Sequence, residues 1–169
     1  MSELTPAQET ILAKVKEVAG GNLLHTDNSY GFLTVTIRKD TLLPLVTALF
    51  EDEGLRFRFL TTMCGLHYPD QKEDLGLMVQ LHSLENNYRI RLKTFFTRDQ
   101  AHLPTLTGLF KGANWMEREA FDFYGIEFKG HPDMRRILNV EDMIMHPMRK
   151  EFPLEDQVRL DKNDKMFGR

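Results

Sequence analysis

Four segments of the sequence alternate between apolar and polar residues. They span residues 31–39, 55–62, 75–84 and 88–96. A period of two places apolar side chains on one face of a strand and polar side chains on the other. Only Glu85, Asn86 and Asn87 separate the last two segments, which predicts a hairpin. The chain is therefore expected to form a sheet with one buried face, and Leu23 and Leu24 begin a further short strand.

Helical periodicity flanks these strands. Thr5, Pro6 and Gln8 form a capping box at the start of a helix that ends before Gly20. Asp40 is predicted to cap a second helix that ends at Gly54. Two short helical pieces follow at 104–111 and 115–124, the second with Asn114 as its cap and Glu117 in the first turn. The order is helix, two strands, helix, three strands, helix. It predicts an α+β two-layer sandwich, with a mixed or mostly antiparallel sheet and helices on one face.

Periodicity stops after Gly125, although apolar residues continue. They are Ile137, Leu138, Val140, Met143, Ile144, Met148, Phe152, Leu154, Val158, Leu160, Met166 and Phe167. A loop of this length is uncommon inside a compact domain, and its apolar side chains need a surface to cover them. We therefore predict a globular α+β domain over residues 1–125 and an extended arm over residues 126–169 that binds a partner protein.

Composition limits the classes of function. A net charge of −3 argues against a nonspecific nucleic-acid binder. No apolar run is long enough to span a membrane, and the first residues do not resemble a signal peptide. These features predict a chain on the cytosolic side. The single cysteine, Cys64, excludes an internal disulfide framework.

The polar face of the predicted sheet is basic. Its cations are Arg38, Arg56, Arg58, Arg89, Arg91 and Lys93. A sheet that binds RNA stacks bases on aromatic side chains of the same face, whereas Phe57 and Phe59 alternate with the arginines here. The pattern favours a protein-facing or solvated surface and no nucleic-acid partner. A free-standing RNA-binding module remains the alternative from a different class of protein.

Motifs for chemistry are missing from the sequence. Cys64 and His67 have the C-x-x-H spacing of two metal ligands, but no second pair accompanies them. Cys64 is interpreted as a small buried apolar residue and His67 as a turn residue. The sequence has neither a Gly-rich phosphate loop nor a nucleophile elbow. We expect no catalytic residue, no metal and no bound cofactor in this chain.

The densest charged segment runs from Glu117 to Asp122. Glu117 is interpreted as a helix cap, and Arg118 and Asp122 as an i, i+4 ion pair. Two His-Pro units, at 131–136 and 146–150, each carry two cations and suggest docking to carboxylates. The candidate interface residues are Glu117, Arg118, Glu119, Asp122, Gly125, His131, Pro132, Arg135, Arg136, His146, Pro147, Arg149, Lys150, Phe152 and Pro153.

The same region carries a resemblance. WMEREAFDFYGIEFKGHPDMRRIL, followed by HPMRKEFPL, closely resembles the signature of the C subunit of proton-pumping NADH-quinone oxidoreductase, the thirty-kilodalton subunit family of bacterial respiratory complex I. The matching positions are Glu117 to Asp122, Gly125 to Phe128, Gly130 to Pro132 and Arg135 to Leu138.

The resemblance implies a peripheral-arm subunit without catalytic residues that docks on the D subunit of the same complex. NADH, FMN, iron–sulfur clusters and quinone would then be bound by other subunits, and membrane contact would occur only through the complex, on the cytoplasmic side of the bacterial inner membrane. The equivalent subunit of a membrane-bound hydrogenase or of a plastoquinone-reducing complex is the alternative within the same superfamily.

Overall fold

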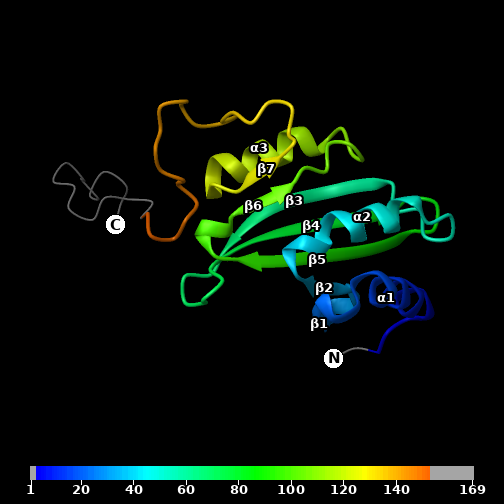
Figure 1. The fold of residues 1–169 in the computed structure, drawn as a ribbon. Coiled ribbons are helices and arrows are strands. Elements are labelled where there is room, and N and C mark those ends of the chain that lie inside the picture. Colours follow the sequence, from blue (N-terminus) through cyan, green and yellow to red (C-terminus); the bar gives the residue numbers. More distant parts are fainter. Residues whose placement is uncertain (1–2, 153–169) are drawn as a thin grey trace, which may run out of the picture.

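The computed structural model describes residues 3–152 (Figure 1). Its helices are α1 (Pro6–Ala19), α2 (Leu42–Glu51) and α3 (Ala113–Tyr124). Its strands are β1 (Leu23–Asp27), β2 (Thr34–Ile37), β3 (Phe59–His67), β4 (Leu75–Ser83), β5 (Tyr88–Phe96), β6 (His102–Pro104) and β7 (Glu127–Lys129). The predicted order of elements is confirmed, and β6 and β7 are additions to it.

The main sheet has five strands in the order β1-β2-β5-β4-β3. Strands β2 and β5 are parallel, and all other neighbours are antiparallel. The predicted hairpin is formed by β4 and β5, with Gln80 opposite Arg91. The sheet is therefore mixed and the fold is α+β, as the sequence indicated.

The core lies between the sheet and α1 and α2, which cover one of its faces (Figure 1). Ile90, Leu92, Thr94 and Phe96 alternate along β5 as buried residues, while the residues between them are only partly buried. The capping box at Thr5 is confirmed, because its side chain and that of Gln8 exchange bonds with each other's backbone amides.

Helix α3 packs along β3, the edge strand of the sheet (Figure 1). The approach is close because Gly65 has no side chain. A Cβ atom at this position would lie 2.2 Å from Cδ2 of Tyr124. Gly65 thus allows the last turn of α3 to rest on the sheet, which fixes the point where the following chain begins.

Strand β3 begins later and ends later than predicted. Residues 53–55 form a turn, in which the Asp52 carboxylate accepts hydrogen bonds from the amides of Gly54 and Leu55, and residues 56–58 are irregular. Arg56 has a positive φ of 50° and pairs with Glu53 and Glu85. Arg56 and Arg58 therefore precede the strand, and the prediction that they share the basic face of the sheet is wrong.

Other local predictions also fail. The N-cap of α2 is Thr41, without a side-chain capping bond, because Asp40 lies in a preceding 3₁₀ turn. No helix forms over 104–111, since β6 ends at Pro104 and turns follow. His67 is the last residue of β3 and is buried, so it is not a turn residue. Cys64 is half-buried.

Residues 126–129 include a further strand. Strand β7 pairs with β6 in a two-stranded parallel sheet, and Ile126 and Phe128 are buried in the core. Regular structure thus extends past Gly125, contrary to the sequence pattern. The division into residues 1–125 and 126–169 remains a prediction. Pro153 and the apolar residues after it lie outside the described residues.

Candidate functional site

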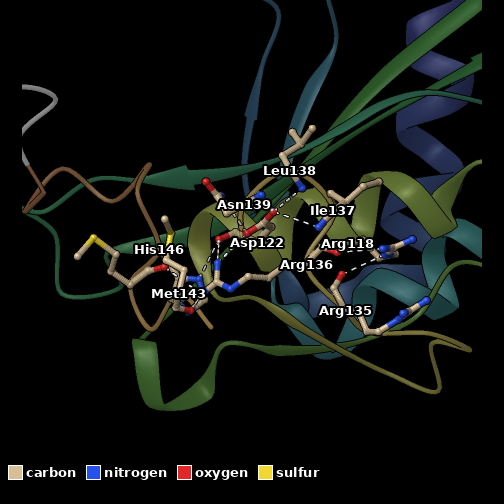
Figure 2. A network of polar contacts seen from close by, with 10 residues as sticks. Arg118, Asp122, Arg135, Arg136, Ile137, Leu138, Asn139, Met143 and His146 are labelled. Carbon is tan, nitrogen blue, oxygen red and sulfur yellow. Dashed lines mark hydrogen bonds and ion pairs between the residues drawn. The ribbon is translucent and has the colours of Figure 1, made fainter. Parts of the chain in front are cut away.

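Asp122 anchors the chain that follows β7 to helix α3 (Figure 2). Its side chain is fully buried. Oδ2 accepts hydrogen bonds from the backbone amides of Ile137, Leu138 and Asn139 at 3.1, 2.8 and 2.9 Å. Oδ1 accepts from the side chains of Asn139 at 3.0 Å and Arg136 at 2.6 Å. Burial raises the pKa of this carboxyl, but the bonds from Asn139, Leu138 and Arg136 outweigh it and hold the pKa far below its usual range.

Arg136 connects Asp122 to residues further along the chain. Its guanidinium is largely buried and also donates to the backbone carbonyl of Asp122 at 2.9 Å. Through Nη2 it donates to the carbonyls of Met143 and Met145 (Figure 2). One side chain therefore joins the end of α3 to two points of an irregular loop. It donates hydrogen bonds to backbone carbonyls of the loop that have no partner in a strand or helix.

Arg118 lies one turn earlier on α3 and contacts the same segment. Nε and Nη2 donate to the carbonyls of Arg135 and Arg136 at 3.0 and 2.9 Å (Figure 2). The predicted Arg118–Asp122 ion pair is therefore wrong. The chain after β7 crosses α3. Its carbonyls bind Arg118, and its amides and the Arg136 side chain bind Asp122, so the two residues do not pair with each other.

Glu117 does not cap α3. The helix begins at Ala113, and Gly112 occupies the N-cap without a side-chain bond, so Asn114 is not the cap either. Glu117 is fully buried and accepts from the amide of Leu106 and the hydroxyl of Thr105, both at 2.6 Å. Burial raises the pKa of its carboxyl. Glu117 thus joins α3 to the turns after β6, while Glu119 is exposed.

The two His-Pro units bind opposite ends of α3. Nε2 of His131 lies 3.0 Å from the carbonyl of Asn114, near the start of the helix. Nδ1 of His146 lies 3.0 Å from the carbonyl of Asp122, near its end. Burial lowers the pKa of His146, as do the neighbouring charges of Arg149 and Arg136. Each imidazole therefore acts as a clamp on the helix backbone.

Gly125 makes room for the second clamp. Its φ of +71° gives the left-handed C-cap of α3. A Cβ atom there would lie 2.5 Å from Nη2 of Arg149 and 2.6 Å from Nε2 of His146. Arg149 donates through Nε to the carbonyl of Tyr124 at 2.9 Å. A larger residue at position 125 would therefore displace both side chains from the end of α3.

A second set of contacts, which the sequence did not reveal, holds residues 150 and 151 against the domain. Nδ1 of His67 accepts the backbone amide of Lys150 at 2.8 Å. Arg98 binds Glu151 through both Nη atoms, at 2.7 and 3.0 Å, and binds Asp74 through Nε at 2.8 Å. The C-x-x-H spacing drew attention to His67, but nothing in the sequence places residue 150 beside it.

We call residues 131–152 the seated arm, because they lie against the domain through these contacts. Its cations serve the chain itself: Arg136 binds Asp122, Arg149 binds a backbone carbonyl, and Arg135 pairs with Asp133. The interpretation that they dock to carboxylates of a partner remains a prediction. Pro132 and Lys150 are exposed, and Pro147 and Phe152 are half-buried.

The seated arm leaves several large apolar side chains exposed. Leu138, Val140 and Ile144 are 66%, 64% and 94% exposed. Met145 and Met148 add further exposed apolar surface. A fixed segment that shows several large apolar side chains to solvent is typical of a protein-binding surface. The assignment of the candidate residues to a subunit interface remains a prediction.

Metal-binding and membrane-spanning features are both absent from the part of the chain that the structure describes. Among residues 3–152, no group of three or more His, Cys, Asp or Glu side chains is arranged to hold a metal ion. No helix in the same range combines the length and apolar character that crossing a membrane requires.

Known proteins are similar to this chain in sequence and in fold. The C subunit of the NADH-quinone oxidoreductase of Paraburkholderia xenovorans (strain LB400) is 37% identical over 159 residues, which cover 90% of this chain and 80% of that protein. The C subunit of the Mesorhizobium japonicum enzyme is 38% identical over 144 residues, covering 85% and 71%.

Two solved structures are similar. A trypsin-resistant fragment of Nqo5 matches with a TM-score of 0.62 and 29% identity, over 73% of this chain and 98% of the fragment. A chain of the archaeal membrane-bound sulfane sulfur reductase has a TM-score of 0.71 at 21% identity, over 86% and 85%. Residues 35–158 match the family described as the 30-kDa subunit of respiratory-chain NADH dehydrogenase, and the chain belongs to that family.

Proposed function

We propose that the chain is a peripheral-arm subunit of a proton-translocating NADH-quinone oxidoreductase and that it docks on the D subunit. Its relatives are named as the C subunit of NADH-quinone oxidoreductase. In this proposal the chain binds no cofactor and has no active site. Other subunits carry electrons from NADH through FMN and iron–sulfur centres to quinone, on the cytoplasmic side of the inner membrane. This chain holds its neighbour in a fixed orientation, which electron transfer between centres requires.

The observation that carries the proposal is the apolar surface of the seated arm. Its backbone is already fixed by Asp122, Arg136 and His67, so little conformational freedom remains to be lost when a partner binds. Leu138 and Ile144 are held in solvent, although burial would be favourable for each of them. A partner with an apolar groove would gain this area without first ordering the arm.

A double substitution tests the docking role. Leu138→Ser with Ile144→Ser removes exposed apolar surface without touching the anchors. Burial of the two side chains contributes about 3 kcal/mol, so binding to the D subunit should weaken roughly 100-fold. The measurement is the fraction of the D subunit that co-purifies with the chain when both are expressed together.

The matched control is Leu24→Ser, which alters an exposed apolar residue of β1, far from the arm. It should leave co-purification unchanged, and all variants should melt at the temperature of the original chain. Normal recovery of the D subunit with the double variant would show that the arm does not dock there.

The identity of the partner subunit distinguishes between the related complexes to which the chain could belong. The fold recurs in an archaeal respiratory membrane complex that reduces sulfane sulfur, so the fold alone does not identify the electron acceptor. Co-purification with a hydrogenase-type or a plastoquinone-reducing partner in place of the D subunit would assign the chain to the corresponding complex.

A further inference from the structure

The face of the main sheet opposite α1 and α2 is not covered by any helix of the described chain (Figure 1). We call it the open face. It includes Thr34 and Thr36 of β2, Arg89, Arg91 and Lys93 of β5, and Met78, Gln80 and His82 of β4. The register places Arg91 between Thr34 and Gln80, and Lys93 between Thr36 and Met78. Mostly polar side chains thus flank a row of cations on the central strand.

The charge of these cations is not paired within the domain. Arg56, Arg58 and Arg98, by contrast, each pair with a carboxylate of the chain. Within residues 3–152, no ion pair involves Arg89, Arg91 or Lys93. Alternate residues of a strand lie roughly 7 Å apart, so the three charges form a line along one side of β5. Their combined field attracts an extended acidic segment.

Arg91 supplies a second observation. Its Cζ atom lies 4.6 Å from the centre of the Phe32 ring, which fixes the guanidinium by a cation–π contact. Its Nε atom is buried and has no hydrogen-bond acceptor among the described residues. A buried donor without an acceptor is costly, and a carboxylate bound at the other guanidinium nitrogens would offset part of that cost by charge pairing. The arginine is therefore already oriented but incompletely bonded.

A groove of about 420 Å³ begins at Arg89, at the end of this row, and runs between the start of α1 and the turn before β2. Its lining includes Tyr30, Phe32, Tyr88 and Arg89 on one side and Thr5, Gln8 and Ile11 on the other. Tyr30 is fully exposed at the tip of a turn, with φ of +58°. Arginine and tyrosine are among the residues that most often contribute large binding energies at protein interfaces. The groove gives the acidic segment an aromatic site at one end of its path.

We propose that the open face binds an acidic segment of a neighbouring subunit, whose carboxylates pair with Arg89, Arg91 and Lys93. The inference rests on the proposed function, because it assumes assembly into a complex. Protein is favoured over RNA because the chain has a net charge of −3, and because the residues directly opposite Arg91 and Lys93 are Thr34, Thr36, Gln80 and Met78 rather than aromatic residues.

Zero-length cross-linking tests the contact in the assembled complex. A carbodiimide joins a lysine amine to a carboxylate that touches it. We expect an amide bond between Lys93 and an aspartate or glutamate of another subunit, identified by mass spectrometry. Lys93→Arg keeps the charge but cannot form the bond, so it should remove this cross-link and leave the complex intact.

Charge reversal tests the energetics. Arg89→Glu with Lys93→Glu should weaken retention in the complex about tenfold at moderate salt, and the salt dependence of retention should become shallower. Lys16→Glu with Lys111→Glu makes the same change in net charge at exposed positions away from the open face and should have no effect. Thermal unfolding of the isolated variants shows whether each one folds.

Three results would contradict the proposal. The proposal is overturned by the absence of a Lys93 cross-link in an intact complex, by a link to residues 153–169 of the same chain, or by RNA bound to the face under ultraviolet cross-linking. These results leave the docking role of the arm untouched. Failure of the Leu138 and Ile144 test would instead reject the proposed function.

Discussion

Lys150 and His67 are 83 positions apart, yet the amide of one donates to Nδ1 of the other at 2.8 Å. His67 is buried at the end of β3, and its Nε2 lies 3.4 Å from Asp74. Because Nδ1 accepts a hydrogen bond, Nε2 carries the proton when the ring is neutral. The end of the seated arm is thus held by the edge strand, while its beginning is held by α3.

Substitution of His67 is expected to release this end. His67→Ala removes the acceptor of the Lys150 amide and should lower the free energy of unfolding by about 1–2 kcal/mol. Trypsin should then cut faster after Arg149 and Lys150. His25→Ala, an exposed histidine on β1, is the matched control and should change neither quantity. Unchanged cleavage in His67→Ala would mean that the Arg98 and Glu151 pair is sufficient.

Loss of the Asp122 charge is expected to free the beginning of the arm. Asp122→Asn leaves Arg136 buried without a counter-charge, which costs about 3 kcal/mol. Limited trypsin digestion should cut after Arg135 and Arg136 before it cuts the domain. Asp142→Asn, at an exposed position of the same arm, should keep the original pattern.

Acid should weaken the same anchor in a defined window. The folded state holds the pKa of Asp122 below the value of about 3.9 for a free aspartate. The folded state therefore binds fewer protons, and the stability it gains is present above roughly pH 4 and lost as pH falls further. Melting temperatures of the original chain and of Asp122→Asn should differ by a constant amount from about pH 5 to 8 and converge below about pH 4. A constant difference down to about pH 2 would contradict this.

The packing of α3 on β3 should fail when Gly65 gains a methyl group. Gly65→Ala places a carbon atom within the Tyr124 ring, and we expect a loss of about 1–3 kcal/mol in unfolding free energy. Gly108→Ala is the control, since no atom lies within 4 Å of its Cβ position. Chemical denaturation measures both. If the two alanine variants were equally stable, the close contact would not be essential.

Arg118→Ala is expected to impair assembly more than electron transfer. It removes two charged bonds to the carbonyls of Arg135 and Arg136, which contribute about 2 kcal/mol to the position of the arm. The abundance of assembled complex and its quinone reductase rate per complex separate the two effects. Normal abundance with a lost rate would show direct participation in the reaction.

Local signals predicted the elements that depend on neighbouring residues. The Thr5 cap needs only Gln8, three positions away, and the hairpin of β4 and β5 needs only the short turn between two alternating runs. The order of helices and strands, and therefore the α+β class, followed from such signals. The family signature was recognised because its residues are contiguous in the sequence.

Partners that arrive from elsewhere in the chain could not be predicted. Helical spacing offers Asp122 only Arg118, whereas its actual partner, Arg136, is 14 positions away across an irregular loop. Glu117 is likewise taken up by Thr105 and Leu106 rather than by the helix start. The beginning of β3 was misplaced because the alternation begins in an irregular segment before the strand, where Arg56 adopts a positive φ.

The order of these contacts along the chain has a consequence for biosynthesis. Asp122, His67 and Arg98 all precede the arm, so the surface that receives it leaves the ribosome first. The most exposed apolar side chain of the arm, Ile144, emerges only when its scaffold is complete. Nascent chains that expose apolar segments early are prone to aggregate. Delaying this surface until late in translation shortens the time during which it can associate with the wrong protein.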